Sequence, residues 1–288
     1  MMKSGVFGRV GRWLVDRHIS SEQRARLLAA SPPLNSAGYD PWGFHPESAL
    51  VSLAAARPLY DSYFRVEASG LDRVPEGRVF LVPNHGGQLP FDGMLVGVAM
   101  ALYAEHPRFV RGMVERWFPS LPFVSPVFVR SGQMVGDPAN CRRLLESDQT
   151  VMVFPEGARG SGKTIWQHYR LQRFGTGFMR LALETNTPIV PVSIVGSEET
   201  YPSIYDAKPL AKLVGAPYIP ITPFFPLLGP LGAIPLPCKI RLNFGEPMRF
   251  EGDCDASDAE IQGKVERVTG QLQGMIDEGL RERGWQLF

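Results

Sequence analysis

Apolar and polar positions follow two different periods along most of the chain after residue 46. Short apolar runs bounded by glycine, proline or polar residues predict strands, and longer segments with apolar residues three or four positions apart predict helices. The predicted strands cover residues 64–69, 78–83, 108–114, 126–131, 150–154, 189–195 and 239–245. The predicted helices cover residues 47–64, 92–105, 140–147, 174–186 and 258–284. This alternation predicts an α/β fold, in which a mostly parallel sheet is sandwiched by helices.

The first 49 residues have a different pattern, and we interpret them as a helical segment with a linker. Residues 1–30 interleave basic side chains with apolar ones, Trp13 among them, which predicts a basic amphipathic helix. Such a helix either lies on an anionic membrane surface or packs on the domain like any surface helix. Residues 31–46 are rich in turn-forming residues and predict a linker. One large domain is expected over residues 50–288.

One long segment interrupts the alternation of strands and helices. Residues 213–238 contain no Asp, Glu, Lys or Arg and include seven prolines, a density that forbids a membrane-spanning helix. Four of these prolines recur at intervals of three, which matches polyproline II: Pro217, Pro220, Pro223 and Pro226. An uncharged loop with Phe and Leu is either a buried crossover or a surface that touches lipid.

Composition narrows the function classes. The net charge of +1 argues against a nucleic-acid partner, for which a strong basic excess is expected. Three widely spaced cysteines, without a Cys-x-x-Cys pair, predict neither a zinc site nor a disulfide framework and fit a reducing compartment. The N-terminal residues lack a signal-peptide pattern and no 18-residue stretch can span a bilayer, so we expect a cytoplasmic protein.

Residues 157–164 match the phosphate-binding pattern G-x-x-x-x-G-K-[ST] of nucleotide hydrolases. Such an enzyme also needs an aspartate at the end of another apolar strand to hold magnesium, and no predicted strand here ends in Asp. Glu156 further places a carboxylate where a phosphate would be repelled. A nucleotide hydrolase is therefore the less favoured alternative.

A more specific chemical signal follows the strand at residues 78–83. His85 comes after this strand, and Asp92 stands seven positions later, near the start of the next predicted helix. Histidine accepts a proton at neutral pH, and a carboxylate on its other nitrogen fixes the tautomer and supports the cation. The chain has no G-x-S-x-G elbow. His85 is thus expected to activate a hydroxyl of the substrate.

Three segments together carry a family resemblance: "NHGGQLPFD", then "VFPEGARG", then "GTGFMRLALETNTPIVPVSI". Over residues 60–250 the chain resembles the glycerolipid acyltransferases of the lysophosphatidic-acid acyltransferase type. In that family a histidine deprotonates an acceptor hydroxyl, which attacks an acyl thioester. The chain also departs from the family pattern. His85 and Asp92 are separated by six residues where the family has four, the usual Ser between them is absent, and Ala158 stands where the family has Thr. The family's arginine-containing block corresponds only loosely to "PVFVRSG", which contains Arg130.

The resemblance implies a site and its partners. His85 and Asp92 would be catalytic, and residues that contact the substrate would be Glu156, Gly157, Arg159, Lys163 and Arg130. Glu156 would support the site through hydrogen bonds, and Arg159 would bind an acceptor phosphate as a fixed, bidentate cation. No metal or other cofactor is expected. The donor would be acyl-CoA or acyl-carrier protein, and the acceptor a lysophospholipid or a glycerol-phosphate-like lipid.

The lipid acceptor also implies a place of action. We expect peripheral association with the inner face of the membrane. The competing hypothesis is a non-catalytic protein that binds lipid or membrane on the same scaffold, and it requires that His85 and Asp92 lie too far apart to bond.

Overall fold

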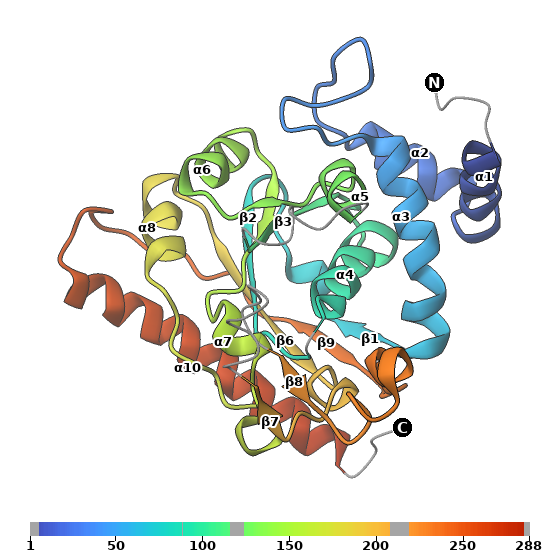
Figure 1. The fold of residues 1–288 in the computed structure, drawn as a ribbon. Coiled ribbons are helices and arrows are strands. Elements are labelled where there is room, and N and C mark those ends of the chain that lie inside the picture. Colours follow the sequence, from blue (N-terminus) through green and yellow to red (C-terminus); the bar gives the residue numbers. More distant parts are fainter. Residues whose placement is uncertain (1–5, 88, 116–123, 208–218, 285–288) are drawn as a thin grey trace.

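A seven-stranded sheet with helices on both faces forms the centre of the molecule (Figure 1), as the sequence predicts. The structure is a computed structural model that describes residues 6–87, 89–115, 124–207 and 219–284. The strands of this sheet are β1 (Glu67–Ser69), β2 (Val79–Pro83), β3 (Val110–Val114), β4 (Met134–Val135), β5 (Thr150–Met152), β6 (Ile189–Val195) and β9 (Arg241–Phe244). The helices are α1 (Val6–His18), α2 (Ser21–Ala29), α3 (Pro46–Pro58), α4 (Phe91–Val98), α5 (Val124–Arg130), α6 (Pro138–Glu146), α7 (Ala158–Ser161), α8 (Gly177–Glu184) and α10 (Asp258–Arg283).

The strand order is β1-β9-β6-β2-β5-β3-β4, and only the β6–β9 pairing is antiparallel. β2 lies at the centre, with Leu81 opposite Met152 of β5 on one side and opposite Val190 of β6 on the other. Because β5, β2 and β6 are parallel neighbours, the loops after all three emerge at one edge of the sheet. This edge carries the candidate site.

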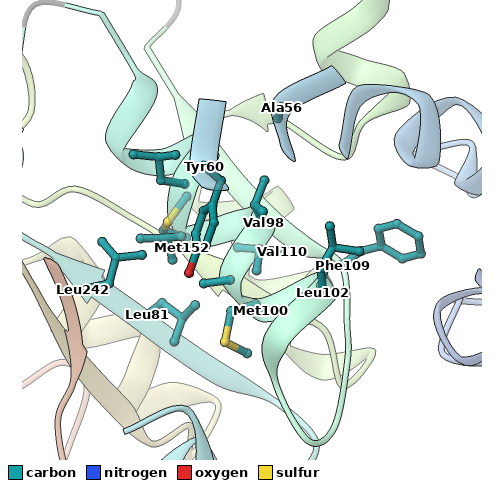
Figure 2. Packing of buried hydrophobic residues seen from close by; sticks show 14 of the residues in the cluster. Ala56, Tyr60, Leu81, Val98, Met100, Leu102, Phe109, Val110, Met152 and Leu242 are labelled. Carbon is teal, nitrogen blue, oxygen red and sulfur yellow. The ribbon is translucent and has the colours of Figure 1, made fainter. Parts of the chain in front are cut away.

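The residues of β2 are all buried because the sheet is covered on both faces. Leu81 faces a core cluster built with α3 and α4, part of which Figure 2 shows around Tyr60, Val98 and Met100. Phe80 and Val82, which point the opposite way, face a second cluster built with α6, α8 and α10. Two closed cores of this kind hold the central strands rigidly.

The N-terminal segment forms two helices where one was expected. Ser20 separates α1 from α2 and caps α2, since its hydroxyl accepts a hydrogen bond from Gln23 N and the Gln23 side chain accepts one from Ser20 N. Val15 and Leu27 are buried in the core cluster beside α3. Within α1, the predicted amphipathic helix therefore packs its apolar face on the domain. Its other face leaves Trp13 62% exposed.

Two further expectations are corrected by the structure. Residues 126–131, predicted as extended from their β-branched residues, lie largely in helix α5. Of the two alternatives for the uncharged segment, a buried crossover or a surface that touches lipid, the buried crossover does not fit its described part, because Leu227 and Leu231 are 83% and 68% exposed. Its described part forms the short strand β8 (Pro220–Ile221), paired with β7 (Tyr205–Asp206), and a 3-10 turn at Gly229–Ala233. Pro217 lies outside the described residues.

Among the described residues, no helix combines the length and the apolarity that crossing a membrane requires.

Candidate active site

The ends of three parallel neighbours bring together residues that are far apart in sequence. His85 follows β2, Glu156 lies four residues after β5, and Glu198 lies three residues after β6. Asn84 fixes the first of these loops, because its side chain donates to Ile194 O at 3.0 Å and accepts from Ile194 N at 2.7 Å. The backbone just before His85 is therefore held as firmly as a strand.

His85 and Asp92 are in direct contact. Nδ1 of His85 lies 2.5 Å from Oδ2 of Asp92, and the Asp92 side chain is fully buried. Asp92 stands in the first turn of α4 and also accepts hydrogen bonds from Gly86 N and Gly93 N. The six intervening residues thus fold back far enough for the pair to bond, as the longer His–Asp spacing requires.

Two glycines make this loop geometry possible. Gly87 has a φ of +81°, a conformation that glycine adopts at no steric cost. Gly160, in α7, lies against His85: a Cβ at position 160 would stand 2.7 Å from the Cβ of His85. The imidazole also contacts the ring of Phe154, with 4.3 Å between ring centroids. The ring of His85 is therefore positioned from several sides.

The charges around His85 favour its protonated form. Burial alone would lower its pKa, but the Asp92 carboxylate and, more weakly, Glu156 outweigh burial and raise the pKa of His85 above its ordinary 6.5, while Lys163 opposes them. Since Nδ1 donates to Asp92, the neutral ring carries its lone pair on Nε2. Within the described residues no group hydrogen-bonds Nε2, and the side chain keeps 14% of its surface exposed. This arrangement suits a general base.

Glu156 makes the supporting hydrogen bonds that the sequence predicts. Its Oε1 accepts from His85 N at 2.9 Å, and its Oε2 accepts from Gln172 N at 2.8 Å. The carboxylate is buried, and Lys163 lies 3.0 Å from Oε2. Glu156 therefore faces the protein and holds the His85 backbone, which leaves it no free oxygen for a substrate.

Lys163 also faces inward, which corrects the expectation that it contacts the substrate. It is 4% exposed and its ammonium also contacts Glu198. This burial also argues against nucleotide binding, because the lysine that would reach a phosphate is paired with two carboxylates. The pattern at residues 157–164 coincides by chance with the "FPEGAR" segment.

Arg159 is exposed on α7, one residue from Gly160. Its Nη2 donates to Arg173 O at 3.0 Å. Among the described residues it forms no ion pair with Glu156 or Asp92, the alternative role for this side chain. Gly157 precedes it with a φ of +57° and lets the chain turn sharply into α7. The guanidinium thus keeps free donors, on a residue next to the glycine that packs on His85.

Arg130 lies elsewhere. It ends α5, and its carbonyl accepts a hydrogen bond from His45 N in the loop before α3. Glu198, by contrast, belongs to the site although sequence reasoning did not select it. Its only sequence signal was its place just after the strand at residues 189–195, in "GSEE".

One acidic cluster has side chains of the kinds that ligate metals. Of the described residues, one group has ligand atoms within 4.8 Å of one another: Asp253, Cys254 and Asp255. It lies in the loop before α10, away from the strand ends that carry His85. Its carboxylates are exposed, and such acidic groups commonly cluster without an ion.

Comparison with known proteins identifies a family for the chain. The family model described as "Acyltransferase" matches residues 65–195, which contain His85, Asp92, Glu156 and Arg159. An uncharacterized protein of Mycobacterium tuberculosis is 42% identical over 257 residues, which cover 86% of this chain and 69% of that protein. An uncharacterized protein of Mycobacterium leprae is 43% identical over 249 residues, covering 84% and 66%.

Two more distant similarities concern named enzymes. The "DGAT1/2-independent enzyme synthesizing storage lipids" of Homo sapiens is 21% identical over 224 residues, which cover 76% of this chain and 63% of that enzyme. The crystal structure of the 1-acyl-sn-glycerophosphate (LPA) acyltransferase PlsC from Thermotoga maritima aligns with a TM-score of 0.47 at 18% identity, covering 78% and 79% of the two chains.

Proposed function

The chain belongs to the acyltransferase family, and from that premise we propose that it is a glycerolipid acyltransferase in which His85 is the general base. The reaction moves an acyl group to a glycerolipid-type acceptor. One observation carries the proposal: the 2.5 Å contact between His85 Nδ1 and Asp92 Oδ2, which leaves the Nε2 lone pair without a hydrogen-bond donor among the described residues. A non-catalytic scaffold would not need this pair to bond.

In the proposed reaction, His85 carries one proton from the acceptor hydroxyl to the departing thiol. The acceptor hydroxyl oxygen bonds to the carbonyl carbon of an acyl thioester while its proton passes to Nε2 of His85. The carbon–sulfur bond then breaks, and the imidazolium returns the proton to the departing sulfur. Asp92 stabilises the imidazolium between these steps. We propose acyl-CoA or acyl-carrier protein as the donor, with no metal or other cofactor.

Arg159 is our candidate for binding a phosphate on the acceptor. Its guanidinium is exposed, and Gly160 beside it touches His85. A planar guanidinium binds a phosphate through two parallel hydrogen bonds, and one donor to Arg173 O leaves the others available. An acceptor phosphate held here would place a neighbouring hydroxyl close to the histidine.

Lipid substrates must be drawn from a bilayer, and the protein has two exposed surfaces that could contact a membrane. The first, which we call the apolar rim, consists of large apolar side chains that are each 40% to 83% exposed: Trp166, Ile204, Tyr205, Phe224, Leu227, Leu228, Leu231 and Ile234. Backbone hydrogen bonds connect its parts, since Ile165 N donates to Ser203 O and Ile204 N donates to Ile221 O. Trp166 lies three residues after Lys163, which binds the His85 carbonyl. The apolar rim therefore adjoins the site.

The second surface is the outer face of α1, where Trp13 is exposed among Arg9, Arg12 and Arg17. Arginine attracts anionic headgroups, and Trp favours the interface between water and lipid. We propose that both surfaces contact the cytoplasmic face of a membrane, the rim through apolar contact and α1 through charge.

The activity is tested by incubating the purified chain with a long-chain acyl thioester and a lysophospholipid. Thiol release and formation of the diacyl product should rise together. If acyl-CoA and acyl-carrier protein both yield neither thiol nor product, while the protein still binds lipid vesicles, the non-catalytic alternative replaces this proposal.

A further inference from the structure

A buried cluster of charged side chains contacts the backbone of His85. Lys163 Nζ stands 3.0 Å from Glu156 Oε2 and 3.1 Å from Glu198 Oε1. The same ammonium donates to the carbonyl of His85 at 3.2 Å. All three charged side chains are at most 4% exposed. Such burial is costly unless every group is paired, so the cluster holds a defined geometry.

The cluster hydrogen-bonds to both backbone polar groups of His85, its N–H and its C=O. Glu156 Oε1 accepts from His85 N, and Lys163 donates to His85 O. The two carboxylates also hold the segment at residues 169–172, between α7 and α8, because Gln172 N donates to Glu156 and Tyr169 N donates to Glu198. Lys163 thus connects the loops after β2, β5 and β6 through its single ammonium.

We propose that Lys163 is a positioning residue for acyl transfer, whose ammonium clamps the backbone of His85 and holds a positive charge next to it. This inference rests on the proposed role of His85. Lys163 itself touches no substrate, because its ammonium is enclosed by Glu156, Glu198 and the His85 carbonyl.

The second part of this role follows from the charges that face the imidazole. Asp92 from α4 and Glu156 from the loop after β5 raise the pKa of His85, while Lys163 lowers it. Glu198 lies on the far side of Lys163, and burial raises its own pKa to about 7. Removing the ammonium would therefore raise the pKa of His85, although a proton gained by Glu198 would mask part of this change.

The test avoids that masking by comparing Glu198→Gln with Glu198→Gln/Lys163→Met. Within this pair the only ionisable group that changes is Lys163, and Glu156 keeps both of its backbone donors. The loss of Lys163 should lower kcat by about 10²-fold, as for a base displaced by about 1 Å, while KM for both substrates changes less than twofold. The acid limb of the kcat profile should move to higher pH. Lys264→Met, which breaks an exposed pair with Glu260 on α10, is the matched control and should change neither quantity.

Several results would overturn the inference. A large rise in acceptor KM at constant kcat would make Lys163 a substrate ligand. A lower kcat that tracks the folded fraction, with an unmoved acid limb, would make the cluster merely structural. Lys163→Met alone provides a second measurement, since an unchanged kcat there would also remove the clamp. His85→Ala is measured in parallel: full activity in it would end the proposed function itself, whereas an inactive His85→Ala with a normal Lys163 variant would end only this inference.

Discussion

Gly160 packs directly on His85: a Cβ at position 160 would stand 2.7 Å from His85 Cβ and 2.8 Å from Glu156 Cβ. Real Cβ atoms do not approach so closely, so Gly160→Ala must displace the histidine or the glutamate. We expect acyl transfer to fall by about 10²-fold, the cost of a misplaced base, while substrate KM values change little.

The control for this variant is Gly263→Ala. Gly263 lies in α10, and a Cβ there would meet nothing within 4 Å. It should leave kcat unchanged and raise stability slightly, since alanine favours a helix by about 1 kcal/mol over glycine. Equal kcat in Gly160→Ala and wild type would show that the packing of residue 160 does not position His85.

Arg159→Ala tests the acceptor phosphate. If the exposed guanidinium forms a bidentate contact, its loss should raise KM for a phosphorylated acceptor by about 10-fold or more and leave the donor KM unchanged. Arg143→Ala, on the exposed face of α6, removes a similar charge away from the site and should change neither constant. An unaltered acceptor KM in Arg159→Ala would indicate a neutral acceptor or a different phosphate ligand.

Membrane contact can be divided between the two surfaces by sedimentation with anionic vesicles. Leu227→Asp/Leu228→Asp should weaken the binding that resists salt, because it removes two exposed apolar side chains of the rim. Arg12→Glu should weaken the salt-sensitive part, by about 1 kcal/mol for each charge lost near the surface. Point substitutions are required because deletion of residues 1–30 would uncover the core around Leu27.

Leu34→Asp is the control for this experiment. Leu34 is 42% exposed in the linker, outside both surfaces. It should bind vesicles like the wild type. If the wild-type chain stays in the supernatant at low salt, both surfaces serve another purpose.

The buried carboxyl of Glu198 should make the free energy of unfolding depend on pH. Burial raises the pKa of its carboxyl from an ordinary 4.5 to about 7, so the folded state binds this proton more tightly than the unfolded chain. Its contribution is present in full below pH 4.5 and is lost as pH rises through 7, with a total on the order of 3 kcal/mol. Chemical denaturation at pH 5 and pH 8 should show a larger fall for wild type than for Glu198→Gln. If the free energy of unfolding falls equally in both proteins, the pH dependence does not come from Glu198.

The sequence predicted the strands around the site well, because β2, β5 and β6 are buried on both faces and appear as short apolar runs. It also placed His85 and Asp92 in one loop. The helix α5 was missed because the valines of "VSPVFVR" favour a strand, and tertiary context overrides such weak propensities. The contact of Lys163 with Glu198 spans 35 positions, and no local pattern reveals such a pair.

The central claim is that His85 accepts the proton of the acceptor hydroxyl under the control of Asp92. The most direct measurement is the pH profile of kcat/KM for wild type, Asp92→Asn and His85→Ala. Wild-type activity should rise through an acid limb above pH 6.5, because only neutral His85 is a base and Asp92 helps raise its pKa. In Asp92→Asn the maximal rate should fall and the limb should move to lower pH, since burial lowers the pKa and the main group that raises it is gone. His85→Ala should lose about 10²–10⁴-fold while remaining folded. An unchanged profile in Asp92→Asn, or wild-type turnover in His85→Ala, would contradict the account.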